Sequence, residues 1–230
     1  MSGYGASNIV DRLHPESVRV YLITSELVRA VHRGLAIKSL KQGDDPEAAR
    51  RHTAHLDGLD WDVILVRDKE FRARSTPSGK IILHTGCFDL LKTDEEIASI
   101  IAHEIGHIVA RHSVERNLYR RSWFPSCLRH YLLQRQELEA DHIGILLLGA
   151  AGYDPRIAPA TIETVKEKLG SRKACATHPS TETRLQLLSQ HKVMEEALEL
   201  YREVKANYSL CLTLRSMAAS PEFGRFLLGE

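Results

Sequence analysis

Apolar residues recur at helical spacing most clearly over residues 93–111, TDEEIASIIAHEIGHIVAR. The apolar positions of this stretch are Ile97, Ile100, Ile101, Ile105, Ile108 and Val109. They return every three or four residues, so in a helix they bury most of one side. Thr93 followed by Glu96 forms a capping box, which predicts that the helix begins there.

Other parts of the chain show the same helical pattern, interrupted by two short apolar runs. We predict further helices over residues 25–41, with Ser25 as the cap, and over 46–55, 136–149, 155–169 and 181–206. Residues 61–66 and 80–84 have the apolar, β-branched content of strands, and a turn signal at 76–79 precedes the second run. The pattern predicts a mainly α fold (α+β) with a small sheet.

Length and composition favour one globular unit. The chain has 230 residues, 43% of them hydrophobic, which is enough for one good-sized core. We divide it into an N-terminal helical segment (1–57), a core (58–206) and a C-terminal helical tail (207–230) that packs or forms oligomers. The formal net charge of +1 provides no bulk attraction to nucleic acid. We therefore expect no nucleic-acid partner.

Membrane and disulfide signals are weak. The longest apolar run, residues 143–151, is far shorter than the roughly 20 residues that cross a bilayer. The opening residues lack the pattern of a signal peptide, and acidic Asp11 and Glu16 are unlike a transit peptide. The four cysteines have no CxxC spacing, which argues against a disulfide framework or a thiolate zinc site. Their usage suits either a reducing, intracellular compartment or buried thiols.

The first predicted helix contains the motif HExxH, formed by His103, Glu104 and His107. Two histidines four positions apart project from one helix face and can bind one metal ion. Neutral imidazoles suit zinc, and a catalytic zinc keeps one position open for water. Glu104 is then the candidate general base. The alternative is a chance match on a solvated helix, which the motif alone does not exclude.

The helix over 136–149 offers the missing carboxylate. Glu137 and Asp141 lie four positions apart on one face, near the start of an apolar run. Two histidines and one carboxylate form a known hydrolytic zinc set, so Glu137 is the predicted third ligand of one Zn²⁺ per chain. Asp141 is suited to accept the free ring N–H of a liganding histidine. Ala110 and Ser113 exclude the metzincin pattern, which needs glycine and histidine there.

Three ordered motifs, HEIGHIVARH, ELEADHIGILLLGAAGYDP and THPSTETR, resemble the gluzincin peptidases of the HtpX and CAAX-prenyl-protease superfamily. Within it, the Oma-type metalloendopeptidases of the mitochondrial inner membrane are the most similar group. The resemblance covers roughly residues 58–203. It implies a zincin-like fold, zinc on His103, His107 and Glu137, catalysis by Glu104, and Asp141 beside a ligand.

The same resemblance implies what the enzyme acts on and where. Substrates are polypeptides, including misfolded or membrane proteins in quality control, and the compartment is the mitochondrial inner membrane. The resemblance also places an edge strand at the cleft that binds substrate backbone by β-augmentation. That strand falls on Ile81, Ile82, Leu83 and His84. The alternative for these residues is a plain structural hairpin.

The third motif contributes two further candidates. His178, followed by Pro179, either binds the developing oxyanion, caps the open zinc position, or is an ordinary loop histidine. Arg184 either orients a carboxylate near the site or forms a surface salt bridge. His112 lies five residues after the motif, and Glu139 is turned away from Glu137. We interpret His112 as structural, hydrogen-bonded or partly exposed, and Glu139 as a surface residue.

Two departures from the family leave a second function open. The turn before the 80–84 strand carries Ser78, and Arg72 stands upstream where the family has asparagine. The connection over 113–135 is short, and it reads either as a membrane-facing amphipathic surface or as a solvated loop that leads into the second helix. Either departure could impair the cleft. The alternative function is a zinc-binding scaffold or adaptor of the same fold.

Overall fold

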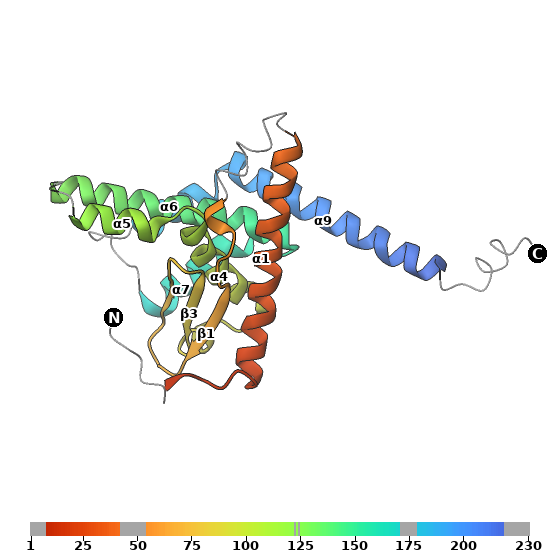
Figure 1. The fold of residues 1–230 in the computed structure, drawn as a ribbon, viewed down its shortest axis with the longest axis horizontal. Coiled ribbons are helices and arrows are strands. Elements are labelled where there is room, and N and C mark those ends of the chain that lie inside the picture. Colours follow the sequence, from red (N-terminus) through yellow and green to blue (C-terminus); the bar gives the residue numbers. More distant parts are fainter. Residues whose placement is uncertain (1–7, 42–53, 122, 124, 171–178, 219–230) are drawn as a thin grey trace, which may run out of the picture.

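The computed structural model describes residues 8–41, 54–121, 123, 125–170 and 179–218. Within this part the chain is mainly helical and carries one small sheet, as predicted (Figure 1). The helices are α1 (Pro15–Lys41), η2 (Ala54–Leu56), α3 (Cys87–Leu90), α4 (Asp94–Val109), α5 (His112–Arg121), α6 (Ser126–Ala151), α7 (Ile157–Leu169), α8 (Thr181–Leu188) and α9 (His191–Ala218). The strands are β1 (Asp62–Val66), β2 (Ala73–Ser75) and β3 (Lys80–His84).

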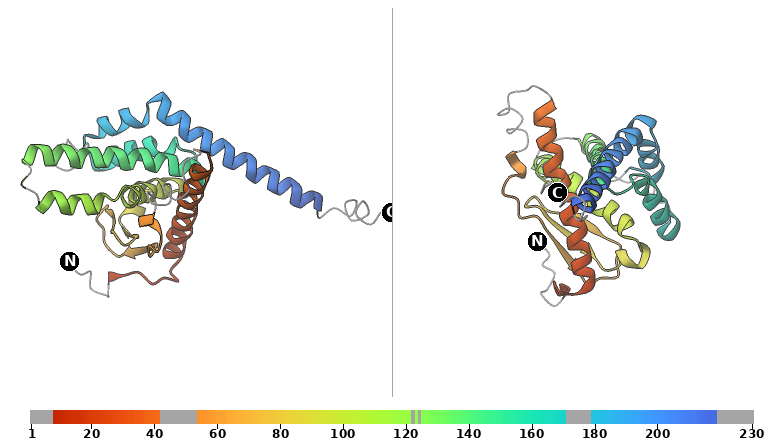
Figure 2. Two further views of the ribbon diagram at one scale, coloured as in Figure 1. Left: turned by 45° about the horizontal axis from the view of Figure 1, so that its top comes forward. Right: turned by 90° about the vertical axis from the view of Figure 1, so that its right-hand side faces the viewer.

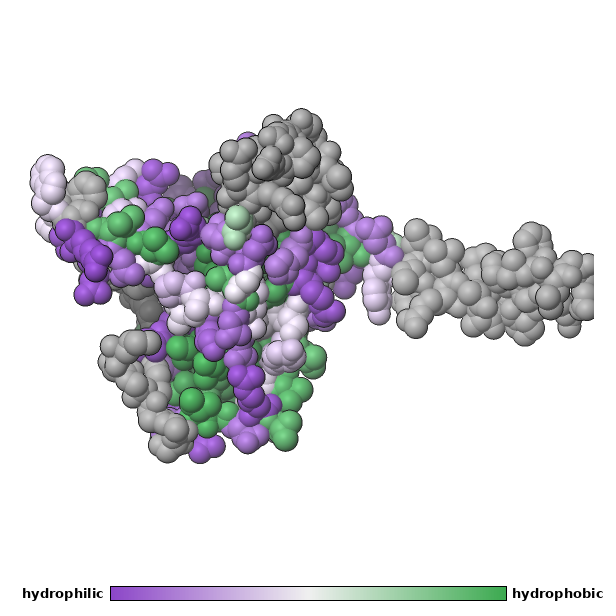
Figure 3. Space-filling view, in the orientation of Figure 1, coloured by the Kyte–Doolittle hydropathy of each residue, from purple (hydrophilic) through white to green (hydrophobic). Residues whose placement is uncertain are grey.

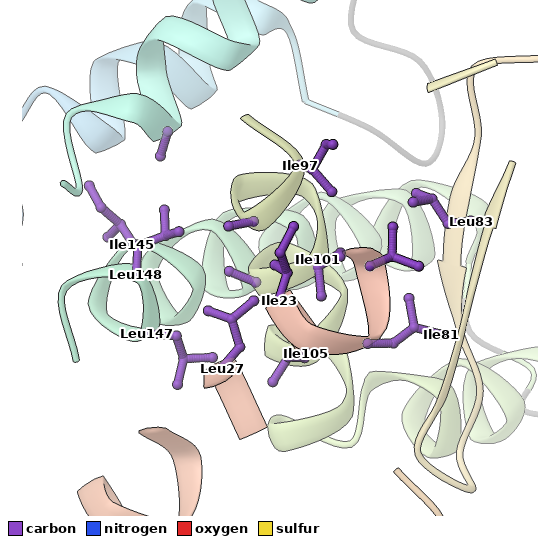
Figure 4. Close-up of a cluster of buried hydrophobic side chains, with 14 of the residues drawn as sticks. Ile23, Leu27, Ile81, Leu83, Ile97, Ile101, Ile105, Ile145, Leu147 and Leu148 are labelled. Atoms are coloured by element: carbon purple, nitrogen blue, oxygen red, sulfur yellow. The ribbon is translucent and has the colours of Figure 1, made fainter. Parts of the chain in front are cut away.

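Helix α4 lies at the centre of the fold. The predicted capping box is confirmed: the Thr93 hydroxyl accepts a hydrogen bond from the Glu96 N–H, and the Glu96 carboxylate accepts from the Thr93 N–H. Ile97, Ile101 and Ile105 are fully buried. Figure 4 shows these side chains between α1, α6 and the sheet. The buried isoleucines therefore determine which side of α4 packs against the rest of the fold. The orientation of the HExxH side follows from this packing.

The sheet has the order β1-β3-β2. Strands β1 and β3 run parallel, whereas β2 pairs antiparallel with the other side of β3. The prediction that Ile81, Ile82, Leu83 and His84 form an edge strand is therefore wrong, because β3 is hydrogen-bonded on both sides. The sequence pattern missed β2 because Ala-Arg-Ser has only three residues and no apolar run. The edge strand on that side of the sheet is β2.

Several helices differ from their predicted bounds, and the one predicted over 136–149 spans Ser126–Ala151. Helix α1 begins at Pro15, and Ser25 lies inside it, where its hydroxyl donates to the Tyr21 carbonyl instead of capping a helix. The prediction of a start at Ser25 is wrong because apolar Val20 and Ile23 extend the buried side towards the N-terminus. The helix predicted over 181–206 is divided into α8 and α9. The helix predicted over 46–55 lies mostly outside the described residues.

The connection between the two motif-bearing helices is mostly helical. The loop predicted after residue 113 forms α5, and α6 begins at Ser126, right after Pro125. Figure 2 shows α5 and α6 side by side, with α9 extending from the opposite end of the molecule. Leu118, Trp123 and Tyr131 are exposed on this connection. No helix among the described residues is long and apolar enough to cross a membrane.

Apolar side chains also gather at the end of the molecule where α1 begins and β1 lies (Figure 3). They border a cavity of about 360 Å³ between the N-terminal segment, α1 and β1. None of the candidate site residues lines this cavity. The predicted metal-binding and catalytic residues therefore lie elsewhere in the structure.

In the described part of the chain, Cys87 and Cys127 are free thiols.

Candidate metal centre

Helices α4 and α6 cross at very short range because glycine stands at the contact from both sides. A Cβ atom added at Gly106 would lie 2.7 Å from the Ala140 carbonyl oxygen. One added at Gly144 would lie 3.2 Å from the His103 backbone nitrogen. Any larger residue at 106 pushes backbone against backbone. The close approach brings the HExxH face of α4 against the start of the apolar part of α6.

Ligand-type atoms of three side chains face one point at this crossing. The Nε2 atoms of His103 and His107 lie 3.2 Å apart. His107 Nε2 lies 3.4 Å from Glu137 Oε1, and His103 Nε2 lies 3.7 Å from Glu137 Oε2. His107 and Glu137 are buried, and the His103 side chain is 16% exposed. The structure thus brings together the three residues predicted as metal ligands.

These distances fit a zinc site. Zinc–nitrogen and zinc–oxygen bonds of about 2.0–2.1 Å in a tetrahedron separate neighbouring ligand atoms by roughly 3.3 Å. The three observed separations lie close to that value. Two imidazoles and one carboxylate are also the donor types found in hydrolytic zinc sites. The residues present therefore fit the group that the motif implies.

Asp141 and Arg184 support His103. Asp141 Oδ1 lies 2.9 Å from His103 Nδ1, and Arg184 donates two hydrogen bonds to the same carboxylate, at 2.6 and 2.7 Å. Burial opposes protonation of His103, but the hydrogen bonds to Asp141 and Glu137 outweigh it and raise the pKa of His103 to about 10. Burial opposes ionisation of Asp141, but Arg184 outweighs it and lowers the pKa of that carboxyl. The carboxylate is therefore charged, and a metal ion that binds His103 displaces a proton.

The ring of His107 is contacted by His112, which we expected to lie away from the metal ligands. His112 is almost fully buried, and its Nδ1 lies 2.8 Å from His107 Nδ1. Its other ring nitrogen, Nε2, lies 3.4 Å from Glu139 Oε2. Burial lowers the pKa of both His107 and His112, so both rings favour the neutral state. In the sequence, His112 follows His107 by five positions, and a continuous helix would have turned its ring away from His107.

Glu137 is held by residues that the sequence did not indicate. Arg116 of α5 donates to Glu137 Oε1 at 2.8 Å and to Gln136 Oε1 at 2.9 Å. Gln136 in turn donates to Glu115. No spacing rule could have identified Arg116, because the segment containing it read as a loop. The short 113–135 connection therefore helps to hold Glu137 at the site.

A cavity of about 520 Å³ opens beside these side chains. Glu104 lines it together with the three candidate ligands, and β2 with the residues just before it lines another side. Glu104 is buried within α4 and still reaches this space. The cavity also contacts Arg184. His178 lies outside the described residues; Pro179 is buried, and Ser180 caps α8.

Comparison with known proteins is consistent with this arrangement. The sequence profile of peptidase family M48 matches residues 46–128 and 125–192. The mitochondrial metalloendopeptidase OMA1 of Arabidopsis thaliana is 34% identical, over 86% of this chain and 56% of its own length. OMA1 of Schizosaccharomyces pombe is 29% identical, over 64% of this chain and 52% of its own length.

A more distant relative comes from bacteria. The beta-barrel assembly-enhancing protease of Escherichia coli K12 is 27% identical, over 53% of this chain and 32% of its own length. The chain thus spans about half the length of the OMA1 relatives, and less of the bacterial one. The region matched by the family profile, residues 46–128 and 125–192, includes most of the residues that the structure describes.

Proposed function

The chain belongs to peptidase family M48, and on that premise we propose that it is a zinc-dependent metalloendopeptidase that cleaves internal peptide bonds. In this proposal His103, His107 and Glu137 hold one Zn²⁺, and Glu104 is the general base. The observation that carries it is the convergence of donor atoms from three side chains, with separations of 3.2 to 3.7 Å, beside a cavity that Glu104 lines.

Each residue of the proposed site has a separate role in hydrolysis. When bound, zinc supplies Lewis-acid chemistry that acidifies water and polarises a carbonyl. Glu104 accepts a proton from the water that attacks the scissile carbonyl carbon, and passes it to the amine as the C–N bond breaks. Asp141 keeps the proton of His103 on Nδ1, so that Nε2 stays available as a donor. Arg184 holds Asp141 charged.

We place the substrate backbone along β2. The His84 N–H donates to the Arg72 carbonyl and the Thr76 N–H donates to the Lys80 carbonyl. In an antiparallel ladder the groups between these bonded positions alternate, so the backbone groups of Ala73 and Ser75 point away from β3. An extended peptide can pair with them, which gives sequence-tolerant binding.

The variant Ser75→Pro tests this placement, since it removes one outward N–H and leaves the β2–β3 pairs intact. Loss of one hydrogen bond of about 1 kcal/mol predicts a roughly fivefold lower kcat/KM than in Ser75→Ala. Thermal unfolding of both variants checks that the sheet is intact. Equal kcat/KM values in the two variants would exclude the β2 edge as the substrate site.

The test of the enzymatic function itself is Glu104→Gln. Zinc-loaded protein should cleave an unfolded polypeptide, and the variant should lose about 10²- to 10⁴-fold in rate while it keeps its zinc. Glu163→Gln, on an exposed position of α7, is the matched control and should cleave at the rate of the wild type. Full activity in Glu104→Gln would contradict the role of Glu104 as general base. Absence of cleavage by the zinc-loaded wild type would favour the scaffold or adaptor alternative. That alternative assumed a blocked cleft, which the cavity beside Glu104 does not support.

The relatives suggest where the protein acts. Two of them are named mitochondrial metalloendopeptidases, so we extend the proposal to a mitochondrial peptidase. A role in protein quality control, on misfolded or membrane proteins, is proposed from the resemblance of the three motifs alone. Fractionation of cells that express the full-length protein tests the location. Recovery with inner-membrane markers is the expected result, and recovery only in the cytosol would contradict it.

A further inference from the structure

The proposed mechanism assigns no role to His112 or Glu139. His112 is 1% exposed, yet it is a polar ring, and it contacts both His107 and Glu139. A buried imidazole costs free energy unless its nitrogens are hydrogen-bonded. Apolar residues fill most of the remaining core of α4. A histidine at this position therefore calls for a specific reason.

The backbone is shaped to bring His112 to this place. In a continuous helix, a residue five positions on is rotated by about 140° and does not meet the first one. Here α4 ends at Val109, and Arg111 adopts φ 60°, the left-handed conformation that usually requires glycine at a helix end. Among the described residues it is the one non-glycine with positive φ. This turn starts α5 beside the end of α4 and directs His112 back onto His107.

The positions of the ring protons determine which histidine donates in the hydrogen bond between His107 and His112. A neutral histidine that binds metal through Nε2 carries its proton on Nδ1. His107 then donates from Nδ1 to His112 Nδ1, 2.8 Å away, and His112 must carry its own proton on Nε2. That proton points to Glu139 Oε2 at 3.4 Å. The opposite direction would put the His107 proton on Nε2, where it faces His103 Nε2 and blocks the donor set.

We propose that His112, oriented by Glu139, is a positioning residue that fixes the ring and tautomer of His107. The chain from Glu139 through His112 to His107 matches, in role, the contact of Asp141 with His103. Each candidate histidine ligand then has its Nδ1 proton held, one by a carboxylate directly and the other through a second imidazole. This inference rests on the proposed zinc site and adds to it the residues that set the geometry of its second histidine.

A pair of variants distinguishes positioning from packing. In His112→Asn the side-chain Oδ1 stands where Nδ1 was and still accepts the His107 proton, whereas His112→Phe keeps the ring shape without an acceptor. Zinc dissociation constants, measured by competition with a chelator, should rise about 10- to 100-fold in His112→Phe and recover most of that loss in His112→Asn. A purely structural role predicts the reverse order, because phenylalanine fills the buried space better. That reverse order, or wild-type affinity in both variants, overturns the proposal.

Nuclear magnetic resonance of the ring nitrogens gives a second readout that does not depend on turnover. In zinc-loaded Glu104→Gln protein, His112 should carry its proton on Nε2 and His107 on Nδ1. A proton on His112 Nδ1 overturns the proposal. If wild-type protein binds zinc but cleaves nothing, the peptidase function fails while both readouts still test His112. If cleavage occurs and the His112 variants bind zinc normally, this inference alone fails.

Discussion

At the residue scale, the buried carboxylate of Asp141 depends on its neighbours for stability. Its side chain is 3% exposed and accepts two hydrogen bonds from Arg184 as well as contacting His103. A buried charge is stable only when it is paired and hydrogen-bonded. Arg184 therefore supports the site from α8, far along the chain from α4.

Arg184→Met should destabilise the metal-free protein by about 2–3 kcal/mol, because it leaves the buried Asp141 charge without its main partner. Urea unfolding measures this free energy. Arg156→Met is the matched control: Arg156 makes a similar two-pronged contact with Asp154, but its side chain is 69% exposed. The control should cost less than about 1 kcal/mol. Equal losses in the two variants would contradict the account of Arg184.

Individual residues could be predicted where local helix geometry decides their position. His103 and His107, like Glu137 and Asp141, share a helix face by their spacing alone, and the structure places all four at one crossing. The same reasoning misplaced His112, because it assumed that the first helix continued past Val109. Glu139 is exposed, as predicted for a surface residue. The left-handed turn at Arg111 has no signal in the sequence, since glycine is the residue expected there.

At the element scale, the contact between α4 and α6 determines whether a metal centre exists. The candidate ligands come from both helices, so the separation of the helices sets the distances between the donor atoms. Gly106 faces the Ala140 carbonyl and Gly144 faces the backbone of His103. Neither neighbour can move aside as a flexible side chain would.

Gly106→Ala should therefore push the two helices apart, at a cost of about 1–3 kcal/mol in the free energy of unfolding. Zinc affinity should fall as well, because Glu137 moves away from the two imidazoles. Gly34→Ala provides the control: Gly34 lies on α1 with nothing within 4 Å of an added Cβ. That change should stabilise the helix by up to about 1 kcal/mol. Wild-type zinc binding by Gly106→Ala would show that the helix spacing does not determine the site.

Elements were predictable in proportion to their length and apolar content. Helix α4 has a capping box and a repeated apolar stripe, and strands β1 and β3 are apolar runs. Strand β2 has neither, and its position next to β3 depends on long-range pairing. Missing it led to the incorrect assignment of β3 as the edge.

At the scale of the whole molecule, α4 is enclosed by α1, α6, α7 and the sheet (Figure 1). The cavity lies beside the HExxH residues of α4. Helix α1 packs directly on α4 and α6. Composition and periodicity could predict a mainly α protein, but not which helices meet, because that depends on how buried faces fit together. The division at residues 57 and 206 stays a prediction.

In the proposed metal centre, α4 and α6, which α5 separates in the chain, share one zinc ion. The most direct test of this proposal is the zinc content and affinity of wild-type protein beside Glu137→Ala, with Glu163→Ala as the control. We expect one zinc per chain in the wild type and the control, and an affinity more than about 100-fold weaker in Glu137→Ala, which loses a ligand. Stoichiometric zinc at wild-type affinity in Glu137→Ala would contradict the account.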